Sequence, residues 1–322
     1  MIKIRTAVVG TGYLGKYHVE KHACLEQSEL VAVCDVDPKA ARRFAKKYNC
    51  LAISDYRELL GKVDAVCIAT PTHTHHKLGK FFLENGIHVL MEKPITATIK
   101  EADELISIAA RNKLKLQVGH LERFNPAIKH IQSESNDLRF IESTRLAPFN
   151  PRGTDVNVIL DLMIHDIDLI QYLVKSPIID IRANGASVIS KTADITNARI
   201  EFESGCVANV TASRVSLKTE RRMRIFKKDG YISINLHEPE TSIIKRGKGN
   251  MAPGIPNVSH KGKKFPKNDA ILEETSNFFD AILHDTPLAV PGEDGRTALA
   301  AALQITDVLH QSKQWNLDRE TV

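Results

Sequence analysis

Glu92, Lys93 and Pro94 place a carboxylate, an amine and an imino acid directly after the apolar run 88–91. Proline fixes its own φ and disfavours helical geometry in the residue before it, so Lys93 is expected at a strand end. Ligands bind at the carboxyl ends of strands in open parallel sheets, and a lysine whose pKa is lowered can carry a proton there. A turn with two solvated charges is the alternative interpretation.

Asp161 and His165 form a second pair of chemical groups, four residues apart within the apolar segment 158–174. Residues at this spacing share one face of an α-helix, so a helix over the segment would place the carboxylate beside the imidazole. Histidine exchanges a proton near neutral pH, which suits it to accept the proton of an alcohol. A helix cap or a surface pair is the alternative, but the apolar character of the segment indicates a buried helix.

Three glycines, Gly10, Gly12 and Gly15, follow an apolar run and precede a helical pattern. In a dinucleotide-binding turn the first permits the tight turn, the second lets the backbone approach a pyrophosphate, and the third lets the helix pack closely. The helix N-terminus supplies N–H groups to the phosphates. Asp35 ends the next apolar run, about 20 residues later, where an acid binds the adenosine ribose. Together these signals predict a dinucleotide site, although Asp35 could instead start a helix.

The charge of Asp35 also bears on which dinucleotide is bound. A carboxylate at this place repels a 2′-phosphate, so the sequence favours NAD over NADP. Arg42 and Arg43 lie further along the chain and leave NADP as the alternative.

His73, His75 and His76 are close in sequence, and imidazole is a common metal ligand. Their spacing is poor for a single closed site, and no Cys, Asp or Glu joins them locally, so no metal is expected. We expect one of these histidines to border the nicotinamide and the others to be solvated.

Short apolar runs alternate with helical patterns over the first 120 residues, and Thr98 with Glu101 reads as a capping box. This alternation predicts right-handed βαβ units and a doubly wound parallel sheet, the Rossmann arrangement. The expected strands are 6–9, 30–34, 64–69, 88–91 and 114–118, and the expected helices are 15–25, 39–48, 76–84 and 98–111.

The second half is rich in β-like segments, with one early helix over 158–174, which predicts a mainly antiparallel sheet. We therefore predict an α/β chain with a dinucleotide-binding domain over 1–120 and a substrate-binding domain over 121–322. The last helices are expected to pack back at the domain junction. The basic stretch between Lys245 and Lys267 is expected to be a solvated loop, with binding of a nucleotide diphosphate as the alternative. The expected strands are 138–146, 179–190, 194–202, 207–215, 223–227 and 231–236, and the last helices 271–283 and 297–309.

The 322 residues are 43% hydrophobic and 26% charged, which is ordinary for a globular chain with two cores. The net charge of +5 favours anionic small molecules over nucleic acid, because no basic stripe is interleaved with aromatic residues. With neither a leader nor a membrane-length apolar run, the chain is expected in the cytoplasm without a membrane partner. An open antiparallel sheet predicts a homo-oligomer. The cysteines are odd in number, lack CxxC spacing and are expected to be buried free thiols: Cys24, Cys34, Cys50, Cys67 and Cys206.

Four motifs together resemble the Gfo/Idh/MocA family of nicotinamide-dependent oxidoreductases, over nearly the whole chain. They are Gly10-x-Gly12-x-x-Gly15-x-x-His18, Ala69-Thr70-Pro71 with His75, Glu92-Lys93-Pro94, and Asp161-x-x-x-His165. The resemblance implies an NAD(P)-dependent dehydrogenase acting on a CH–OH group, with Lys93 and His165 catalytic and Asp161 in the polar network of the substrate site. It places Glu92 near the nicotinamide ribose. The implied cofactor contacts are Gly10, Thr11, Gly12, Tyr13, Leu14, Gly15, Asp35, Ala69, Thr70, Pro71, His75, Glu92 and Lys93, and the implied substrate contacts are Lys93, His120, Arg123, Asp161 and His165.

A narrower resemblance rests on the segments 119–126 and 160–168. They resemble the members of the family that oxidise the 3-hydroxyl of UDP-N-acetylglucosamine to a 3-keto sugar nucleotide for transamination in lipid A synthesis. The expected mechanism has His165 accept the hydroxyl proton, Lys93 hydrogen-bond the same oxygen and Asp161 position the pair, although the two bases could exchange roles. The alternatives are a dehydrogenase of inositol, a free sugar or a dihydrodiol, and a non-catalytic NAD-binding regulator.

Overall fold

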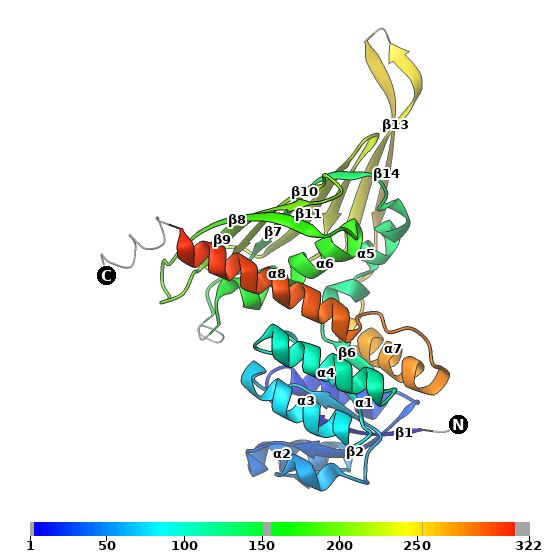
Figure 1. The fold of residues 1–322 in the computed structure, drawn as a ribbon. Helices are drawn as coiled ribbons and strands as arrows, with labels where there is room; N and C mark the ends of the chain where they lie inside the picture. Colours follow the sequence, from blue (N-terminus) through cyan, green and yellow to red (C-terminus); the bar gives the residue numbers. More distant parts are fainter. Residues whose placement is uncertain (1–2, 151–155, 253, 313–322) are drawn as a thin grey trace. The chain divides into compact units, whose positions relative to one another are not determined.

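The structure is a computed structural model that describes residues 3–150, 156–252 and 254–312 (Figure 1). The chain divides into two compact units. Unit 1 comprises Met1–Leu121 and Asp269–Leu299, and unit 2 comprises Glu122–Asn268 and Ala300–Val322. The segment Asp269–Leu299 therefore joins unit 1, although it follows the β-rich second half in the sequence.

Unit 1 is built on a six-stranded parallel sheet with the order β3-β2-β1-β4-β5-β6. This order is that of the doubly wound dinucleotide-binding fold, so the predicted fold class is confirmed. The strand β3 was missed because it has only three residues and two of them are exposed. The strands are β1 (Ile4–Val9), β2 (Ser28–Cys34), β3 (Leu51–Ile53), β4 (Ala65–Ile68), β5 (His88–Met91) and β6 (Leu116–Val118), and the helices between them are α1 (Gly15–Cys24), α2 (Pro38–Tyr48), α3 (His75–Glu84) and α4 (Ile99–Arg111).

Local sequence signals account for where these elements begin and end. All four residues of β4 are buried, as expected for a strand covered on both faces. The capping box of α4 is present: the Glu101 N–H donates to the Thr98 hydroxyl oxygen at 3.3 Å, and the Thr98 N–H donates to the Glu101 carboxylate at 3.0 Å. Asp37 caps α2 by accepting the Lys39 N–H at 2.9 Å.

The late helix α7 (Ala270–His284) completes the core of unit 1. Its Phe278 and Phe279 are fully buried and join Val8, Val33 and Leu90 in one hydrophobic cluster. The following helix, α8 (Gly292–Gln311), begins five residues before the predicted start at 297. The boundary between the two units falls inside α8, after Leu299.

Unit 2 is built on an eight-stranded sheet with the order β14-β13-β12-β11-β7-β10-β9-β8. All pairs are antiparallel except β7 with β10, so the prediction of a mainly antiparallel sheet is confirmed. The helix α6 packs against β7 and β10. The elements are α5 (Pro126–Ile131), β7 (Leu138–Leu146), α6 (Ile164–Val174), β8 (Ile178–Ala186), β9 (Ile195–Phe202), β10 (Val207–Ser213), β11 (Glu220–Lys227), β12 (Gly230–Asn235), β13 (Glu240–Ala252) and β14 (Ile255–Lys264).

The expected solvated loop in the basic stretch is wrong, because β13 and β14 form a long hairpin there. The hairpin extends beyond the other strands of unit 2 (Figure 1). Every residue of β14 is exposed, so burial imposes no alternation of apolar and polar residues on its sequence. The pairing is instead carried by the backbone ladder, with Ile243 opposite Lys261. Within the described ranges, no helix combines the length and hydropathy needed to cross a bilayer.

Candidate active site

Gly10 and Gly15 hold the turn after β1 in a geometry that excludes side chains. Gly10 has a φ of +90°, and a Cβ there would lie 2.5 Å from the carbonyl oxygen of Ala69. A Cβ on Gly15 would lie 1.9 Å from the carbonyl oxygen of Gly10. The turn is thus packed against the residue that follows β4, and the start of α1 is packed against the turn, as the dinucleotide-binding interpretation requires.

Gly12 differs from the other two glycines because open space surrounds it. Apart from its chain neighbours, no described heavy atom lies within 4 Å of the place that its Cβ would occupy. Leu14, at the start of α1, provides no side-chain cap to the helix N-terminus, and Tyr13 is 58% exposed. Backbone N–H groups and the helix dipole at such an N-terminus favour a phosphate, so the turn fits the pyrophosphate of a dinucleotide.

Asp35 follows β2 and ties it to the glycine turn. Thr11 donates its backbone N–H at 2.7 Å and its hydroxyl at 2.8 Å to Oδ2 of Asp35. The Asp37 N–H donates to Oδ1 at 2.9 Å. A carboxylate has about four acceptor positions, so Asp35 can still accept a hydrogen bond from a ribose hydroxyl. Its half-buried place at the end of β2 fits the predicted role.

His75 links the turns that follow β4 and β5. Its side chain is buried, with Nε2 2.8 Å from the carbonyl oxygen of Thr70 and Nδ1 2.9 Å from that of Pro94. Burial lowers the pKa of His75 although the two carbonyl groups act in the other direction. Ala69 and Pro71 flank Thr70 in the first of these turns. The contacts give His75 a positioning role, and its contact with the cofactor stays a prediction.

The two histidines beside His75 have separate surroundings. His73 is exposed, whereas His76 lies 2.8 Å from a carboxylate oxygen of Glu104. Among the described residues, no group of three or more His, Cys, Asp or Glu side chains is arranged to hold a metal ion.

Glu92 is a buried carboxylate beside Lys93. His18 Nε2 lies 2.8 Å from Oε1 of Glu92, and the Lys93 N–H donates to Oε2 at 3.2 Å. Burial by itself raises the pKa of Glu92, but His18 and Lys93 outweigh it and hold the pKa below its ordinary value. The carboxylate therefore stays ionised at neutral pH. The Lys93–Pro94 peptide bond is cis, and Lys93 itself is half-buried.

A second buried carboxyl group, Glu274 of α7, was missed by the sequence interpretation. Neither of its carboxyl oxygens has a hydrogen-bond partner among the described residues. Burial and the charge of Glu92 raise the pKa of Glu274 well above its ordinary value. His22 is also buried, and burial together with His18 lowers its pKa to about 3. The sequence signal that could have revealed Glu274 is a glutamate on the apolar face of the helix predicted over 271–283.

In unit 2, Asp161 lies where the predicted helix departs from α geometry, and His165 lies in the α-helix that follows. Residues Ile159–Met163 form a π-helical turn that continues directly into α6. A π turn changes the angular spacing of side chains, so the α-helical geometry predicted for the whole segment is wrong at Ile159–Met163. That Asp161 and His165 share one face stays a prediction. Both residues are half-buried. Asn157 starts the segment by accepting the Leu160 N–H at 2.9 Å with its side chain.

Arg123 is buried in a bidentate ion pair. Its Nε and Nη2 donate to the two carboxylate oxygens of Asp168 at 2.7 and 2.8 Å. Its guanidinium carbon lies 4.0 Å from the ring centroid of Tyr172. These contacts support a role in positioning α6, and a substrate contact of Arg123 stays a prediction. His120, in unit 1, is also buried.

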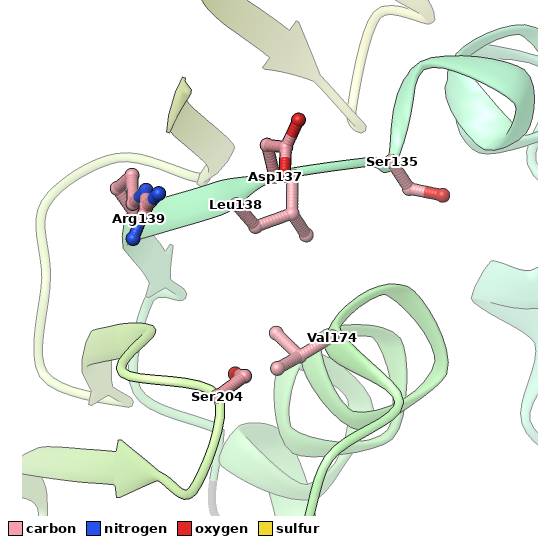
Figure 2. A pocket seen from close by; sticks show the side chains of 6 residues that line it. All are labelled: Ser135, Asp137, Leu138, Arg139, Val174 and Ser204. Atoms are coloured by element: carbon pink, nitrogen blue, oxygen red, sulfur yellow. The ribbon is translucent and has the colours of Figure 1, made fainter. Parts of the chain in front are cut away.

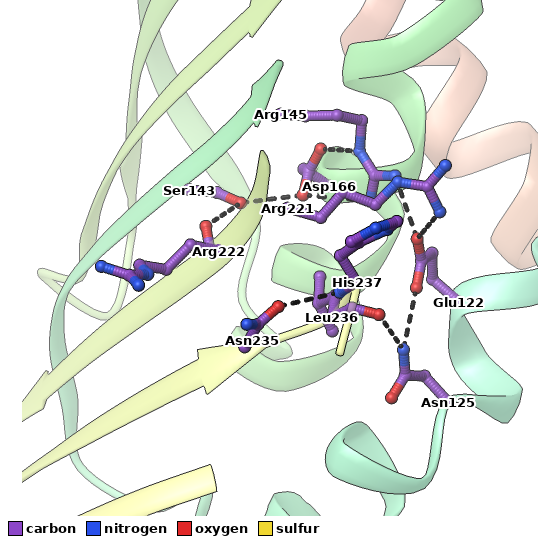
Figure 3. A network of polar contacts seen from close by, with 10 residues as sticks. All are labelled: Glu122, Asn125, Ser143, Arg145, Asp166, Arg221, Arg222, Asn235, Leu236 and His237. Atoms are coloured by element: carbon purple, nitrogen blue, oxygen red, sulfur yellow. Dashed lines mark hydrogen bonds and ion pairs between the residues drawn. The ribbon is translucent and has the colours of Figure 1, made fainter. Parts of the chain in front are cut away.

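Four charged side chains from separate segments meet in unit 2 (Figure 3). Arg145 of β7 donates to Asp166 of α6 at 2.6 Å and to Glu122 at 2.9 Å, and Arg221 of β11 approaches Glu122 at 3.4 Å. Burial raises the pKa of Glu122, but the two arginines outweigh it and hold it below its ordinary value. We call these four residues the charge network. One member, Asp166, directly follows His165 in the chain. The sequence interpretation missed the network because its members come from four segments.

A cavity of about 230 Å³ lies elsewhere in unit 2 (Figure 2). It is formed at the start of β7 and the end of α6, whereas the charge network lies at the end of β7 and the start of α6. It contains none of the predicted site residues, so we assign no chemistry to it. Its lining residues are Ser135, Asp137, Leu138, Arg139, Val174 and Ser204.

Comparisons with known proteins agree with this arrangement. The oxidoreductase family Gfo/Idh/MocA, with an NAD-binding Rossmann fold, matches residues 4–120, and the C-terminal domain of the same family matches residues 128–233. UDP-N-acetylglucosamine 3-dehydrogenase from Acidithiobacillus ferrooxidans is 41% identical over 95% of this chain and 97% of its own length. A solved structure of that enzyme has a TM-score of 0.89, 38% identity and coverage of 96% of this chain and 98% of that chain.

A more distant relative is also named as a dehydrogenase. Inositol 2-dehydrogenase from Rhizobium meliloti is 27% identical over 93% of this chain and 94% of its own length. The first family model covers the glycine turn of unit 1, and the second covers the Asp161–His165 segment of unit 2. The chain therefore belongs to the Gfo/Idh/MocA family of oxidoreductases and is a dehydrogenase that acts on a CH–OH group.

Proposed function

We propose that this enzyme oxidises the 3-hydroxyl of UDP-N-acetylglucosamine with NAD, giving the 3-keto sugar nucleotide that a transaminase would use in lipid A synthesis. The observation that supports this substrate is the 41% identity, over 95% of the chain, to an enzyme named for that reaction. An inositol is the second candidate substrate, because an inositol 2-dehydrogenase is 27% identical over a similar length.

The choice of NAD over NADP is supported by Asp35. Its carboxylate lies at the end of β2, fixed by Thr11, where it would accept a ribose hydroxyl and repel a 2′-phosphate. Arg42 and Arg43 are exposed on α2, which begins three residues after Asp35. Replacing Asp35 by alanine should therefore lower the preference for NAD and raise the relative activity with NADP.

The proposed mechanism assigns two bases to one hydroxyl group. NAD held by the glycine turn and Asp35 would supply the hydride acceptor for the carbon that carries this hydroxyl. His165 takes the hydroxyl proton, Lys93 hydrogen-bonds the same oxygen, and Asp161 positions the pair. The neighbouring Glu92 is ionised and is anchored by His18, so it can fix the backbone at Lys93. Positioned acid–base groups of this kind contribute about 10²–10⁴-fold to a rate.

The substrate assignment is tested by following NADH formation with UDP-N-acetylglucosamine, free N-acetylglucosamine, myo-inositol and scyllo-inositol. We expect a clear preference for the sugar nucleotide with NAD. Equal or faster turnover of an inositol would contradict the assignment. A protein that binds NAD but forms NADH from none of these compounds would support the non-catalytic regulator instead.

The catalytic assignment is tested with Lys93→Met and His165→Asn. Each should lower kcat by about 10²–10⁴-fold while the Kd of NAD stays near that of the wild type. Arg224→Gln is a suitable control, because Arg224 belongs to an exposed ion pair with Glu142. Normal turnover by Lys93→Met would show that the mechanism is wrong.

We also propose that the sheet of unit 2 forms the contact of a homo-oligomer. The exposed side chains of Ile179 on β8 and Ile244 on β13 support this proposal, because exposed apolar residues on an open sheet favour association. Native mass spectrometry tests it directly, and a monomer at micromolar concentration would contradict it.

A further inference from the structure

The two arginines of the charge network share its acids unequally. Arg145 on β7 and Arg221 on β11 are direct partners in the antiparallel pair, and like charges in that relation destabilise a sheet unless acids neutralise them. Asp166 accepts two hydrogen bonds from Arg145, at 2.6 and 3.4 Å. Glu122 accepts from Arg145 at 2.9 Å but from Arg221 only at 3.4 Å. Arg145 therefore makes more and shorter hydrogen bonds to the two acids than Arg221 does.

Arg221 keeps donor capacity that the network does not use. Among the described residues, Glu122 is the only acid within ion-pair distance of Arg221, and Nη1 donates the hydrogen bond between them. A guanidinium carries five N–H donors, so those on Nε and Nη2 have no acid partner in this part of the chain. The Arg221 side chain is 44% exposed, whereas that of Arg145 is 4% exposed. Figure 3 shows both guanidinium groups reaching toward Glu122.

The electrostatic surroundings of Arg221 favour an added anion. Burial and the neighbouring charge of Arg145 lower the pKa of Arg221 below its ordinary value, so the cation is incompletely stabilised by the protein. Lys218 and Arg222 lie close to Arg221 in the sequence and are exposed. Asp166, in the same network, directly follows His165 in the chain. Arg221 therefore lies at a basic end of the sheet, in contact with a network that includes the residue after the proposed proton acceptor.

We propose that Arg221 is an anion-binding residue that takes the diphosphate of a nucleoside-diphosphate sugar. This inference rests on the proposed function, because it assigns a residue to the part of the substrate that an inositol or a free sugar lacks. The planar guanidinium can donate two parallel hydrogen bonds to phosphate oxygens, which a lysine cannot do. The sugar and the uridine are uncharged, so the diphosphate is the group that an arginine would recognise.

The cofactor has a pyrophosphate of its own, which we assign to residues other than those that bind the diphosphate of the substrate. The glycine turn of unit 1 fits the pyrophosphate of the dinucleotide, whereas Arg221 belongs to unit 2. Removing the Arg221 charge should therefore weaken the binding of UDP and leave the binding of NAD unchanged.

The experiment compares Arg221→Gln with Arg224→Gln. Arg224 is a matched control because it lies on the same strand, is 47% exposed and has its own partner in Glu142. By calorimetry, we expect the Kd of UDP to rise on the order of 10–100-fold in Arg221→Gln, as for the loss of charge-assisted hydrogen bonds. The Kd of uridine, the Kd of NAD and the Tm should match the wild type. Arg224→Gln should match the wild type in all four.

Steady-state kinetics give a second readout. In Arg221→Gln, the KM for UDP-N-acetylglucosamine should rise by the same factor while kcat changes little, because the diphosphate is remote from the reacting carbon. An unchanged Kd of UDP would overturn the inference. A fall in Tm with equal losses of UDP and uridine affinity would also overturn it, because that pattern indicates a structural role.

The inference and the proposed function can fail separately. If the wild type binds UDP through Arg221 but forms no NADH from UDP-N-acetylglucosamine, the proposed function fails and the anion site stands. If the wild type oxidises UDP-N-acetylglucosamine and Arg221→Gln does so with the same KM, the anion site fails and the function stands.

Discussion

The two units stabilise their polar sites by different physical means. In unit 1, the glycine turn is fixed by backbone contacts that leave no room for a Cβ on Gly10 or Gly15, and the acid Glu92 is balanced by His18. In unit 2, the charge network is fixed by mutual neutralisation of four side chains from separate segments. Substitutions in unit 1 should therefore lower stability through steric clashes and the burial of charge, whereas those in unit 2 should lower it by leaving charges unpaired.

The largest effect should come from Gly15→Ala. Its Cβ would lie 1.9 Å from the carbonyl oxygen of Gly10, so the start of α1 must move, and we expect both a strong loss of stability and loss of NAD binding. Gly12→Ala is the matched control, because the place of its Cβ is open. It should keep the Tm of the wild type and lose only NAD affinity. Thermal unfolding and NAD titration separate the two, and equal Tm values for both variants would contradict the steric argument.

Arg145→Met should have the next largest effect. It leaves Asp166 and Glu122 buried without their main cation, and breaking a buried ion pair in this way costs about 3–5 kcal/mol in the free energy of unfolding. Arg224→Gln, which breaks an exposed pair with Glu142, should cost about 1 kcal/mol or less. Denaturant unfolding measures both, and a cost for Arg145→Met as small as that of the control would show that the network does not stabilise unit 2.

Glu274→Gln should stabilise unit 1 at alkaline pH. The folded pKa of Glu274 lies well above its value of 4.5 in the unfolded chain, so the folded state binds the extra proton and loses stability as the pH rises through this window. Glutamine has the same shape and cannot ionise. We expect the variant to be more stable than the wild type at pH 8, by about 1–3 kcal/mol, and nearly equal at pH 4.5. The exposed Glu84→Gln should show no such difference.

His22→Phe should change the pH dependence of the free energy of unfolding at acid pH. The folded pKa of His22 is about 3 and its ordinary value is 6.5, so the unfolded chain binds the proton first and stability is lost as the pH falls below 6.5. This loss amounts to about 1 kcal/mol per pH unit, and it should be absent in the variant. Unfolding free energies between pH 7 and 4 test it, with the exposed His73→Gln as the control. The same slope in His22→Phe and the wild type would refute the assignment.

The parts of the structure that the sequence predicted are those encoded by neighbouring residues. Gly10, Gly15 and the capping box of Thr98 and Glu101 act over a few residues, so their spacing alone predicts the turn and the start of the helix. The strand β4 is covered on both faces and is therefore apolar throughout. Asp35 was predicted because it ends a strand at a fixed distance after the turn, and the structure places its carboxylate on Thr11.

The parts that were missed depend on distant contacts or on no burial at all. The strand β14 is exposed along its whole length, so its sequence lacks the alternation that burial imposes. Arg221 reaches Glu122 across 99 residues, and such a pairing has no local pattern. The π turn at Ile159–Met163 could not be read from the apolar segment, because an α-helix and a π turn both satisfy the same composition.

The placement of α7 in unit 1 has a consequence for how the protein can be divided. Phe278 and Phe279 are synthesised after all the strands of both sheets, yet they fill the core beside Val8 and Leu90. A fragment ending near residue 120 would contain every strand of the parallel sheet but would expose the apolar surface that these phenylalanines cover. The cofactor-binding half is therefore not a transferable module, and a ribosome must nearly finish the chain before that half can close.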